Sequence, residues 1–258
     1  MSVEPAPRAR GFVAGVSFLT RVPVPGAIGE RDIAASIAWF PVVGAFVGAV
    51  SGAVYLGASQ LWPPLVAALL AVGVGIAVTG AFHEDGLGDT ADAFGAASTG
   101  RDPQPALKDP RMGTFGVVAL VLVIGLRVAL VAALTPRAGA LALIAAHALA
   151  RGVSAATVVS APSAGQGLGS SYAALAPRWR GVVAVIVACV IGTVCIGIAA
   201  PVALALAAVA ALLQVRWAER VLGGVSGDVL GTIEQAGELI TLLVAVAFAA
   251  HVAGFPLV

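Results

Sequence analysis

Long apolar blocks alternate with short polar stretches along this chain. A block of about 20 apolar residues is the length that crosses a bilayer as an α-helix. The pattern predicts seven such spans, at about 33–56, 65–82, 113–134, 138–159, 181–199, 202–215 and 229–250. Phe12 to Leu19 is apolar but too short to span, and Arg21 and a Pro23–Val24–Pro25 break follow it. We therefore expect an interfacial or re-entrant helix there.

The segments between the spans are expected to be turns and loops, the longest being the polar loop from His83 to Met112. Within the first span, Gly44, Gly48 and Gly52 recur at every fourth residue. This spacing of small residues lets a second membrane helix approach closely. The first span should therefore pack tightly on a neighbour.

The composition agrees with a membrane protein. Of the 258 residues, 60% are hydrophobic and 10% are charged, and the mean hydropathy is +1.02. A soluble domain carries about 25% charged residues, so this chain cannot cover a water-facing surface. We expect an all-α, polytopic integral membrane protein in which residues 1–258 form a single membrane-embedded domain.

Positive charge is distributed unevenly between the two ends of the predicted spans. Eleven of the 14 Lys and Arg residues lie in the N-terminal segment or in the loops 83–112, 160–180 and 216–228, which share one side if the spans alternate. The opposite side holds only Arg137. Because Lys and Arg favour the cytoplasmic side, we expect a cytoplasmic (inner) membrane protein. Its N-terminus and polar loops lie in the cytoplasm, and its C-terminus lies outside.

One ten-residue stretch, His83 to Asp92, concentrates acidic side chains in this oily chain. If it is helical, Asp85, Asp89 and Asp92 lie at i, i+4 and i+7 and share one face. Such carboxylates repel one another unless a cation neutralises them. Oxygen ligands without cysteine favour a hard ion, Mg²⁺ or Mn²⁺. His83 beside them is a candidate metal ligand, base or phosphate-orienting group.

A candidate anion site follows in the same polar segment. Lys108 and Arg111 stand three residues apart, just before a span whose first turn begins at Gly113 and Thr114. The free N–H groups of a helix N-terminus, flanked by cations, suit a phosphate or pyrophosphate. The alternative is that Lys108 and Arg111 anchor the span to anionic lipid head groups.

A second polar cluster lies at the start of the last span. Asp228 suits the N-terminal cap of that helix, and Glu234 and Glu238 follow one to three turns later. Carboxylates at this depth must face a protein interior or an aqueous cavity and need a partner. They are candidate metal ligands that share one site with Asp85 to Asp92. The alternative is that they form structural ion pairs with the intramembrane arginines, Arg127 and Arg151.

Arg127 and Arg151 are themselves open to two interpretations, substrate contact or a buried ion pair. His147 and His251 are lone histidines on apolar helices, and we expect them to be structural.

Three motifs and the N-terminal Phe18–Pro25 segment together resemble one family. They are His83-x-Asp85-Gly86-Leu87-x-Asp89-Thr90-x-Asp92, Lys108-Asp109-Pro110-Arg111-Met112-Gly113-Thr114-Phe115-Gly116 and Gly223-Gly224-x-x-Gly227-Asp228-x-Leu230-Gly231-x-x-Glu234. In order and spacing they resemble cobalamin synthase, the adenosylcobinamide-GDP ribazoletransferase family. Glu84 and Gly88 depart from the Leu and Ala expected in that family, and Glu84 adds a charge beside the candidate metal ligands.

The resemblance implies a Mg²⁺-dependent membrane phosphotransferase of vitamin B12 synthesis. Such an enzyme joins adenosylcobinamide-GDP to α-ribazole or α-ribazole 5′-phosphate and releases GMP. The partners implied are these two small molecules and the lipid bilayer, without nucleic acid. Other cobalamin-assembly enzymes and a second copy of the chain remain open as protein partners.

Our mechanistic hypothesis gives each candidate a role. The metal ions are held by the carboxylates of Asp85, Asp89 and Asp92, joined by Asp228 or Glu234. Lys108 and Arg111 neutralise non-bridging phosphate oxygens. A carboxylate or His83 takes the proton of the ribazole hydroxyl, and the sequence does not choose between them.

Two rival functions remain. A phospholipid-type CDP-alcohol phosphotransferase uses a similar aspartate motif, but its usual Ala-Arg pair is replaced here by Gly88-Asp89. A metal or ion transporter would place acids near the membrane midplane in broken helices, often within inverted repeats. The chain shows no such repeat.

Overall fold

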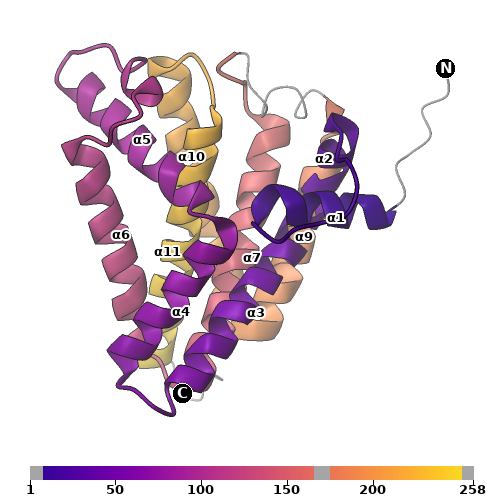
Figure 1. The fold of residues 1–258 in the computed structure, drawn as a ribbon, viewed down its shortest axis with the longest axis vertical. Helices are drawn as coiled ribbons and strands as arrows, with labels where there is room; N and C mark the ends of the chain where they lie inside the picture. Colours follow the sequence, from indigo (N-terminus) through magenta and orange to yellow (C-terminus); the bar gives the residue numbers. More distant parts are fainter. Residues whose placement is uncertain (1–7, 166–174, 252–258) are drawn as a thin grey trace.

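The computed structural model describes residues 8–165 and 175–251, and within them the chain is an all-α bundle (Figure 1). The helices are α1 (Arg8–Leu19), α2 (Glu30–Ser36), η1 (Ile37–Trp39), α3 (Phe40–Ala58), α4 (Pro64–Thr79), α5 (Phe82–Ser98), η2 (Ala106–Lys108), α6 (Thr114–Ala132), α7 (Pro136–Ser160), α9 (Trp179–Ile196), α10 (Ala199–Val221) and α11 (Gly227–His251). Six helical segments in the described ranges are long and apolar enough to cross a membrane, and α4 with α5 would form a seventh. The predicted all-α, multi-span architecture is confirmed.

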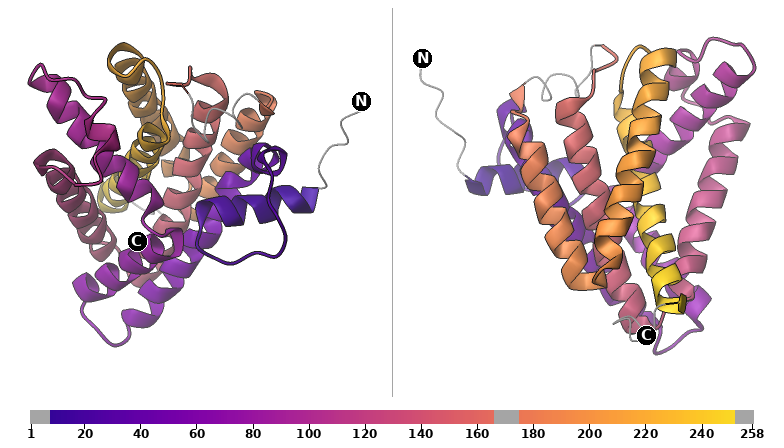
Figure 2. Two further views of the ribbon diagram at one scale, coloured as in Figure 1. Left: turned by 45° about the horizontal axis from the view of Figure 1, so that its top comes forward. Right: turned by 180° about the vertical axis from the view of Figure 1, so that it is seen from behind.

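Helix α7 lies at the centre of the bundle, between α3, α9 and α11 (Figures 1 and 2). Small residues of α3 let this helix lie very close to α7. A Cβ on Gly48 would lie 2.6 Å from the Cα of Ile144, and one on Gly52 would lie 3.1 Å from the Cα of Ala140. The glycine ridge predicted on the first span is therefore the contact surface between α3 and α7.

Helix α1 lies crosswise to the long helices, at the side of the bundle beside the start of α3 (Figure 1). Aromatic contacts hold it there: Phe12 meets the edge of Trp39 at 5.6 Å, and Phe18 stacks on Phe40 at 5.9 Å. The short apolar helix predicted at 12–19 is present, and its crosswise orientation agrees with an interfacial position.

The segment 83–112, expected to be a loop, is the main correction to the predicted elements. Residues 82–98 form α5, and the predicted span at 65–82 ends at Thr79. The backbone turns through Gly80 (φ 68°) and Ala81 (φ 56°), and the axes of α4 and α5 differ by 91°. The acidic residues of α5 are compatible with a helix, because one face of this helix is open and its other faces pack on α6 and α11. Helix α10 likewise continues to Val221, through part of the predicted loop 216–228.

The polar segments gather at one end of the molecule. The α5–α6 connection, the α7 C-terminus and the turn between α10 and α11 lie at one end, and the α3–α4 and α6–α7 turns lie at the other (Figure 1). The segments that the charge pattern assigns to one side are thus together. That this end faces the cytoplasm remains a prediction.

Candidate active site

The site is built where the N-terminal halves of α5 and α11 cross. Gly86 lies so near the α11 backbone that a Cβ would be 2.9 Å from the Cα of Asp228, and one on Gly231 would be 3.1 Å from the carbonyl oxygen of His83. The Thr232 hydroxyl donates to the Gly86 carbonyl oxygen at 3.2 Å. Two glycines and one hydroxyl therefore bring Asp228 beside the aspartates of α5.

The aspartate cluster consists of Asp85, Asp89, Asp92 and Asp228. Helix α5 places the first three on one face, as predicted. Asp85 is exposed, whereas the other three are half-buried. Within the described ranges, the carboxylates of Asp85 and Asp89 have neither a hydrogen-bond partner nor an ion-pair partner. The Asp228 carboxylate accepts a hydrogen bond from the Ser226 hydroxyl at 3.3 Å and one from its own backbone N–H.

Asp92 differs from the others because the first turn of α6 holds it. The Gly113 N–H donates to one carboxylate oxygen at 2.6 Å, and the Gly116 N–H donates to the other at 2.9 Å. A carboxylate at a helix N-terminus is favoured by the exposed N–H groups and by the helix dipole. The amides expected to bind phosphate at Gly113 and Thr114 thus lie in a turn that Asp92 already caps.

Lys108 and Arg111 lie on the connection between α5 and α6, and both are exposed. The Arg111 guanidinium donates two hydrogen bonds to Asp109, at 3.0 and 2.9 Å. These bonds lower the pKa of the Asp109 carboxyl below its usual value. Asp109 therefore holds the Arg111 guanidinium next to the N-terminus of α6, as a cation open to solvent.

A buried ion network lies deeper, between α5, α6, α7 and α11. Its members are Glu84, Arg127, His147, Arg151, Glu234, Gln235 and Glu238. Arg127 donates to Glu84 at 3.2 Å and to Gln235 at 2.9 Å, and it pairs with Glu238. Arg151 donates to Glu238 at 2.9 Å and also pairs with Glu234. The intramembrane arginines and the two glutamates of α11 are thus ion-paired with one another.

The network also contains the tightest group of metal-type ligands in the described part of the chain. Ligand atoms of His147, Glu234 and Glu238 lie within 4.8 Å of one another. Positive charge is already supplied there by Arg127 and Arg151, which neutralise two carboxylates. Asp228 precedes Glu234 by six residues, or about 9 Å along the helix, so the network is a separate layer beneath the aspartate cluster.

His83 lies between the two layers. It is 5% exposed, and its Nδ1 lies 3.6 Å from a carboxylate oxygen of Glu234. That distance is beyond a hydrogen bond, and Nδ1 has no hydrogen-bond partner among the described residues. His83, which the sequence placed beside the metal ligands, therefore faces the buried network and an adjoining cavity.

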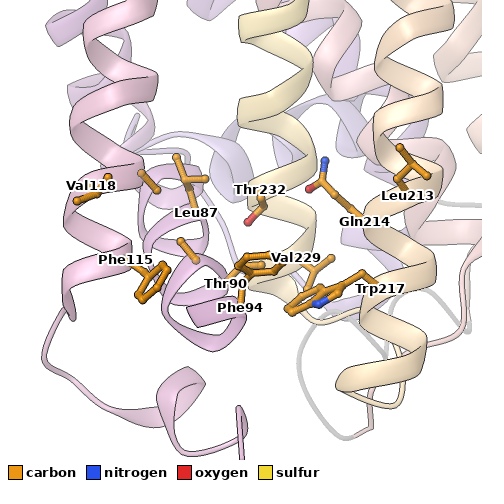
Figure 3. Close-up of a pocket in the computed structure, with 12 residues that line it drawn as sticks. Leu87, Thr90, Phe94, Phe115, Val118, Leu213, Gln214, Trp217, Val229 and Thr232 are labelled. Carbon is orange, nitrogen blue, oxygen red and sulfur yellow. The ribbon is translucent and has the colours of Figure 1, made fainter. Parts of the chain in front are cut away.

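Two cavities flank α5 and α11 on opposite sides. The phenylalanine cavity, about 260 Å³, adjoins His83 and is lined by residues of α1, α2, η1, α3, α5, α7 and α11, with Phe18, Phe40 and Phe82 among them. The tryptophan cavity, about 500 Å³, lies between α5, α6, α10 and α11. Figure 3 shows the second, in which Phe94 lies beside Trp217 with ring centroids 5.8 Å apart.

Comparison with known proteins decides the family. The model of the family described as cobalamin-5-phosphate synthase matches residues 11–246. The chain belongs to the cobalamin-5-phosphate synthase family. An adenosylcobinamide-GDP ribazoletransferase from Bradyrhizobium diazoefficiens is 43% identical over 242 residues, which cover 90% of this chain and 91% of that protein. One from Leptothrix cholodnii is 36% identical over 252 residues, covering 91% and 94%. No solved structure matches the chain.

Membership in the cobalamin-5-phosphate synthase family confirms the resemblance inferred from the motifs. The two departures from the expected pattern now have positions in the structure. Glu84 turns away from the aspartate face and pairs with Arg127. A Cβ on Gly88 would lie 2.6 Å from the end of the Met112 side chain, a flexible group that can shift to admit the expected alanine.

Sequence reasoning missed three parts of this site. Gln235 was not selected, although it donates to both Glu84 and Glu234, at 3.1 Å each. The capping role of Asp92 was also missed, because the three α5 aspartates look equivalent on a helical wheel. The third is the cavity beside His83, whose lining comes from seven helices. Only Gln235 could have been found from the sequence, because it is a polar residue that directly follows Glu234.

Proposed function

We propose that this chain transfers the adenosylcobinamide phosphate group of adenosylcobinamide-GDP to α-ribazole or its 5′-phosphate, releasing GMP, at the cytoplasmic face of the cell membrane. Relatives over nine-tenths of the chain bear the name of this activity. The observation in the molecule that supports it best is the pair Asp85 and Asp89. These carboxylates have no partner within the described ranges, and the α5–α11 crossing sets them beside Asp228.

The aspartate cluster fits a hard divalent cation. Its donors are all carboxylate oxygens, which Mg²⁺ and Mn²⁺ prefer. Like charges so placed are destabilising without a cation. In this proposal Asp85, Asp89 and Asp228 hold Mg²⁺, and Asp92 supports them by fixing α5 to α6. Bound Mg²⁺ would polarise the pyrophosphate and stabilise the charge that develops on its oxygens.

The reaction joins one oxygen to phosphorus and releases another. The ribazole hydroxyl oxygen forms a bond to the corrinoid-side phosphorus of the pyrophosphate, and the bond from that phosphorus to the bridging oxygen breaks. GMP leaves with that oxygen. The hydroxyl proton passes to an aspartate carboxylate or to His83. Lys108 and Arg111, on the exposed connection before α6, neutralise non-bridging oxygens as the guanosine phosphate departs.

The buried ion network holds the site in place. Glu234 and Glu238 extend from the same helix as Asp228 and pair with arginines of α6 and α7. In this proposal Arg127 and Arg151 position α11 through these pairs.

The proposal is tested with purified full-length protein, Mg²⁺, adenosylcobinamide-GDP and α-ribazole 5′-phosphate. We expect equimolar GMP and a cobalamin phosphate product, no product in EDTA, and recovery when excess Mg²⁺ is added. Turnover of a CDP-linked lipid in place of the GDP-linked corrinoid would contradict the proposal and support the phospholipid-type rival.

A further inference from the structure

The phenylalanine cavity has the size and chemistry of a site for a small aromatic molecule. Its volume of about 260 Å³ is just below the range for drug-sized ligand pockets, about 300–1,000 Å³, and so suits a smaller molecule. Phe18 lies edge-on to Phe82 with ring centroids 5.6 Å apart, and it stacks on Phe40. Ile33, Ile37 and Val158 add aliphatic surface. A flat apolar ring would be enclosed by aromatic and aliphatic side chains.

Few polar groups line this cavity, and two of them carry a nitrogen atom that has no hydrogen bond. Nδ1 of His83 and Nε of Arg151 are buried without a hydrogen bond among the described residues, and the two side chains are 7% and 1% exposed. Unpaired buried polar atoms are costly and point to a missing partner. Ser154 contributes a hydroxyl to the same lining. The cavity therefore offers hydrogen bonds for one or two polar atoms within an apolar enclosure.

The cavity adjoins the aspartate cluster through both helices of the crossing. Gly227, in its lining, directly precedes Asp228. Phe82 and His83, also in its lining, precede Asp85 by less than one helical turn. A molecule held in the cavity would thus have its outer end next to the carboxylates that we assign to Mg²⁺.

We propose that the phenylalanine cavity binds the benzimidazole base of the α-ribazole acceptor, and so directs the attacking hydroxyl toward Asp85 and Asp228. This inference rests on the proposed function. The base is flat, mostly apolar and has one free ring nitrogen, which matches a lining with few polar groups. Guanine presents many more hydrogen-bonding atoms than this lining can satisfy, and the corrin ring is far larger than the cavity.

The test places the same substitution in each of the two cavities. Val158→Trp fills the phenylalanine cavity, and Val118→Trp fills the tryptophan cavity; both positions are at least partly exposed, so a larger side chain can be accommodated. We expect Val158→Trp to raise the KM for α-ribazole by roughly tenfold or more, a loss typical of blocked shape complementarity. The KM for adenosylcobinamide-GDP should stay within about twofold of wild type, and Val118→Trp should change neither KM.

Three results would overturn the inference: an unchanged KM for α-ribazole in Val158→Trp, a rise confined to the KM for adenosylcobinamide-GDP, or a rise in Val118→Trp alone. If Val158→Trp does not fold, as judged by gel filtration and circular dichroism, Val158→Phe replaces it. Equilibrium dialysis of α-ribazole against wild type and variant, without the corrinoid, gives a second measurement. Failure of the proposed function itself is distinct, because the wild-type protein would then form no cobalamin product.

Discussion

At the residue scale, the charged side chains divide into a cluster that is open to a cation and a network that is already paired. Glu234 and Glu238 lie in the membrane-spanning part of α11, yet arginines on α6 and α7 neutralise them. The aspartate cluster, nearer the N-terminus of the same helix, has few protein partners. Burial thus separates carboxylates that hold helices together from carboxylates suited to metal chemistry.

Removing one partner of the buried network should be costly. Glu238→Gln leaves Arg127 and Arg151 short of a carboxylate, and we expect a loss of roughly 3–5 kcal/mol in unfolding free energy. Glu84→Leu is the matched control, since Glu84 pairs with Arg127 alone, whereas Glu238 pairs with both arginines, and the substitution introduces the residue expected in the family. Its cost should stay below about 1 kcal/mol. Equilibrium unfolding in detergent measures both, and similar losses for the two variants would contradict this account of the network.

Substitutions of the α5 aspartates should also differ in their effect on the stability of the protein. Asp92→Ala removes the acceptor of the Gly113 and Gly116 N–H groups, so it should destabilise the protein by about 0.5–2 kcal/mol. Asp85→Ala removes an exposed carboxylate that repels its neighbours, so stability should be unchanged or higher by roughly 0.2–0.5 kcal/mol. Thermal unfolding without divalent cations measures the difference. A larger loss in Asp85→Ala would mean that the capping assignment is wrong.

At the element scale, the site depends on how closely α5 and α11 cross. Hydropathy did not predict this crossing, because the acidic character of residues 83–92 resembles that of a surface loop. The helix exists because its buried face has a partner: Gly86 and Gly231 allow backbone contact, and Glu84 finds Arg127. The break before it depends on Gly80 and Ala81, whose positive φ values end α4.

A methyl group at the crossing should disrupt the site. In Gly86→Ala the new Cβ would meet the α11 backbone, and we expect a loss of about 1–3 kcal/mol from overpacking, with much weaker ribazole transfer because Asp228 moves away from Asp85. The control is Gly125→Ala in α6, where a Cβ has open space. That variant should gain up to about 1 kcal/mol from helix propensity. Full activity in Gly86→Ala would show that the close crossing is not required.

At the scale of the whole molecule, composition and apolar block length were enough to predict a multi-span helical bundle. The Gly44–Gly48–Gly52 ridge also predicted where α3 packs on another helix. The motifs identified the family, and the i, i+4, i+7 spacing placed three aspartates on one face. The sequence did not predict which carboxylates pair with Arg127, because several carboxylates lie within reach of that arginine in any bundle of this kind. The cavity beside His83 is likewise formed by seven helices, and no local sequence pattern predicts it.

The central claim, that the aspartate cluster is the catalytic metal site, is tested most directly by GMP release from Asp89→Asn. This substitution keeps the size of the side chain and removes its charge at a position without a protein partner in the described ranges. With saturating adenosylcobinamide-GDP, α-ribazole 5′-phosphate and Mg²⁺, we predict a kcat reduced by at least about 100-fold, or roughly 2.7 kcal/mol in the barrier, with unfolding unchanged. GMP release at the wild-type rate would contradict the claim.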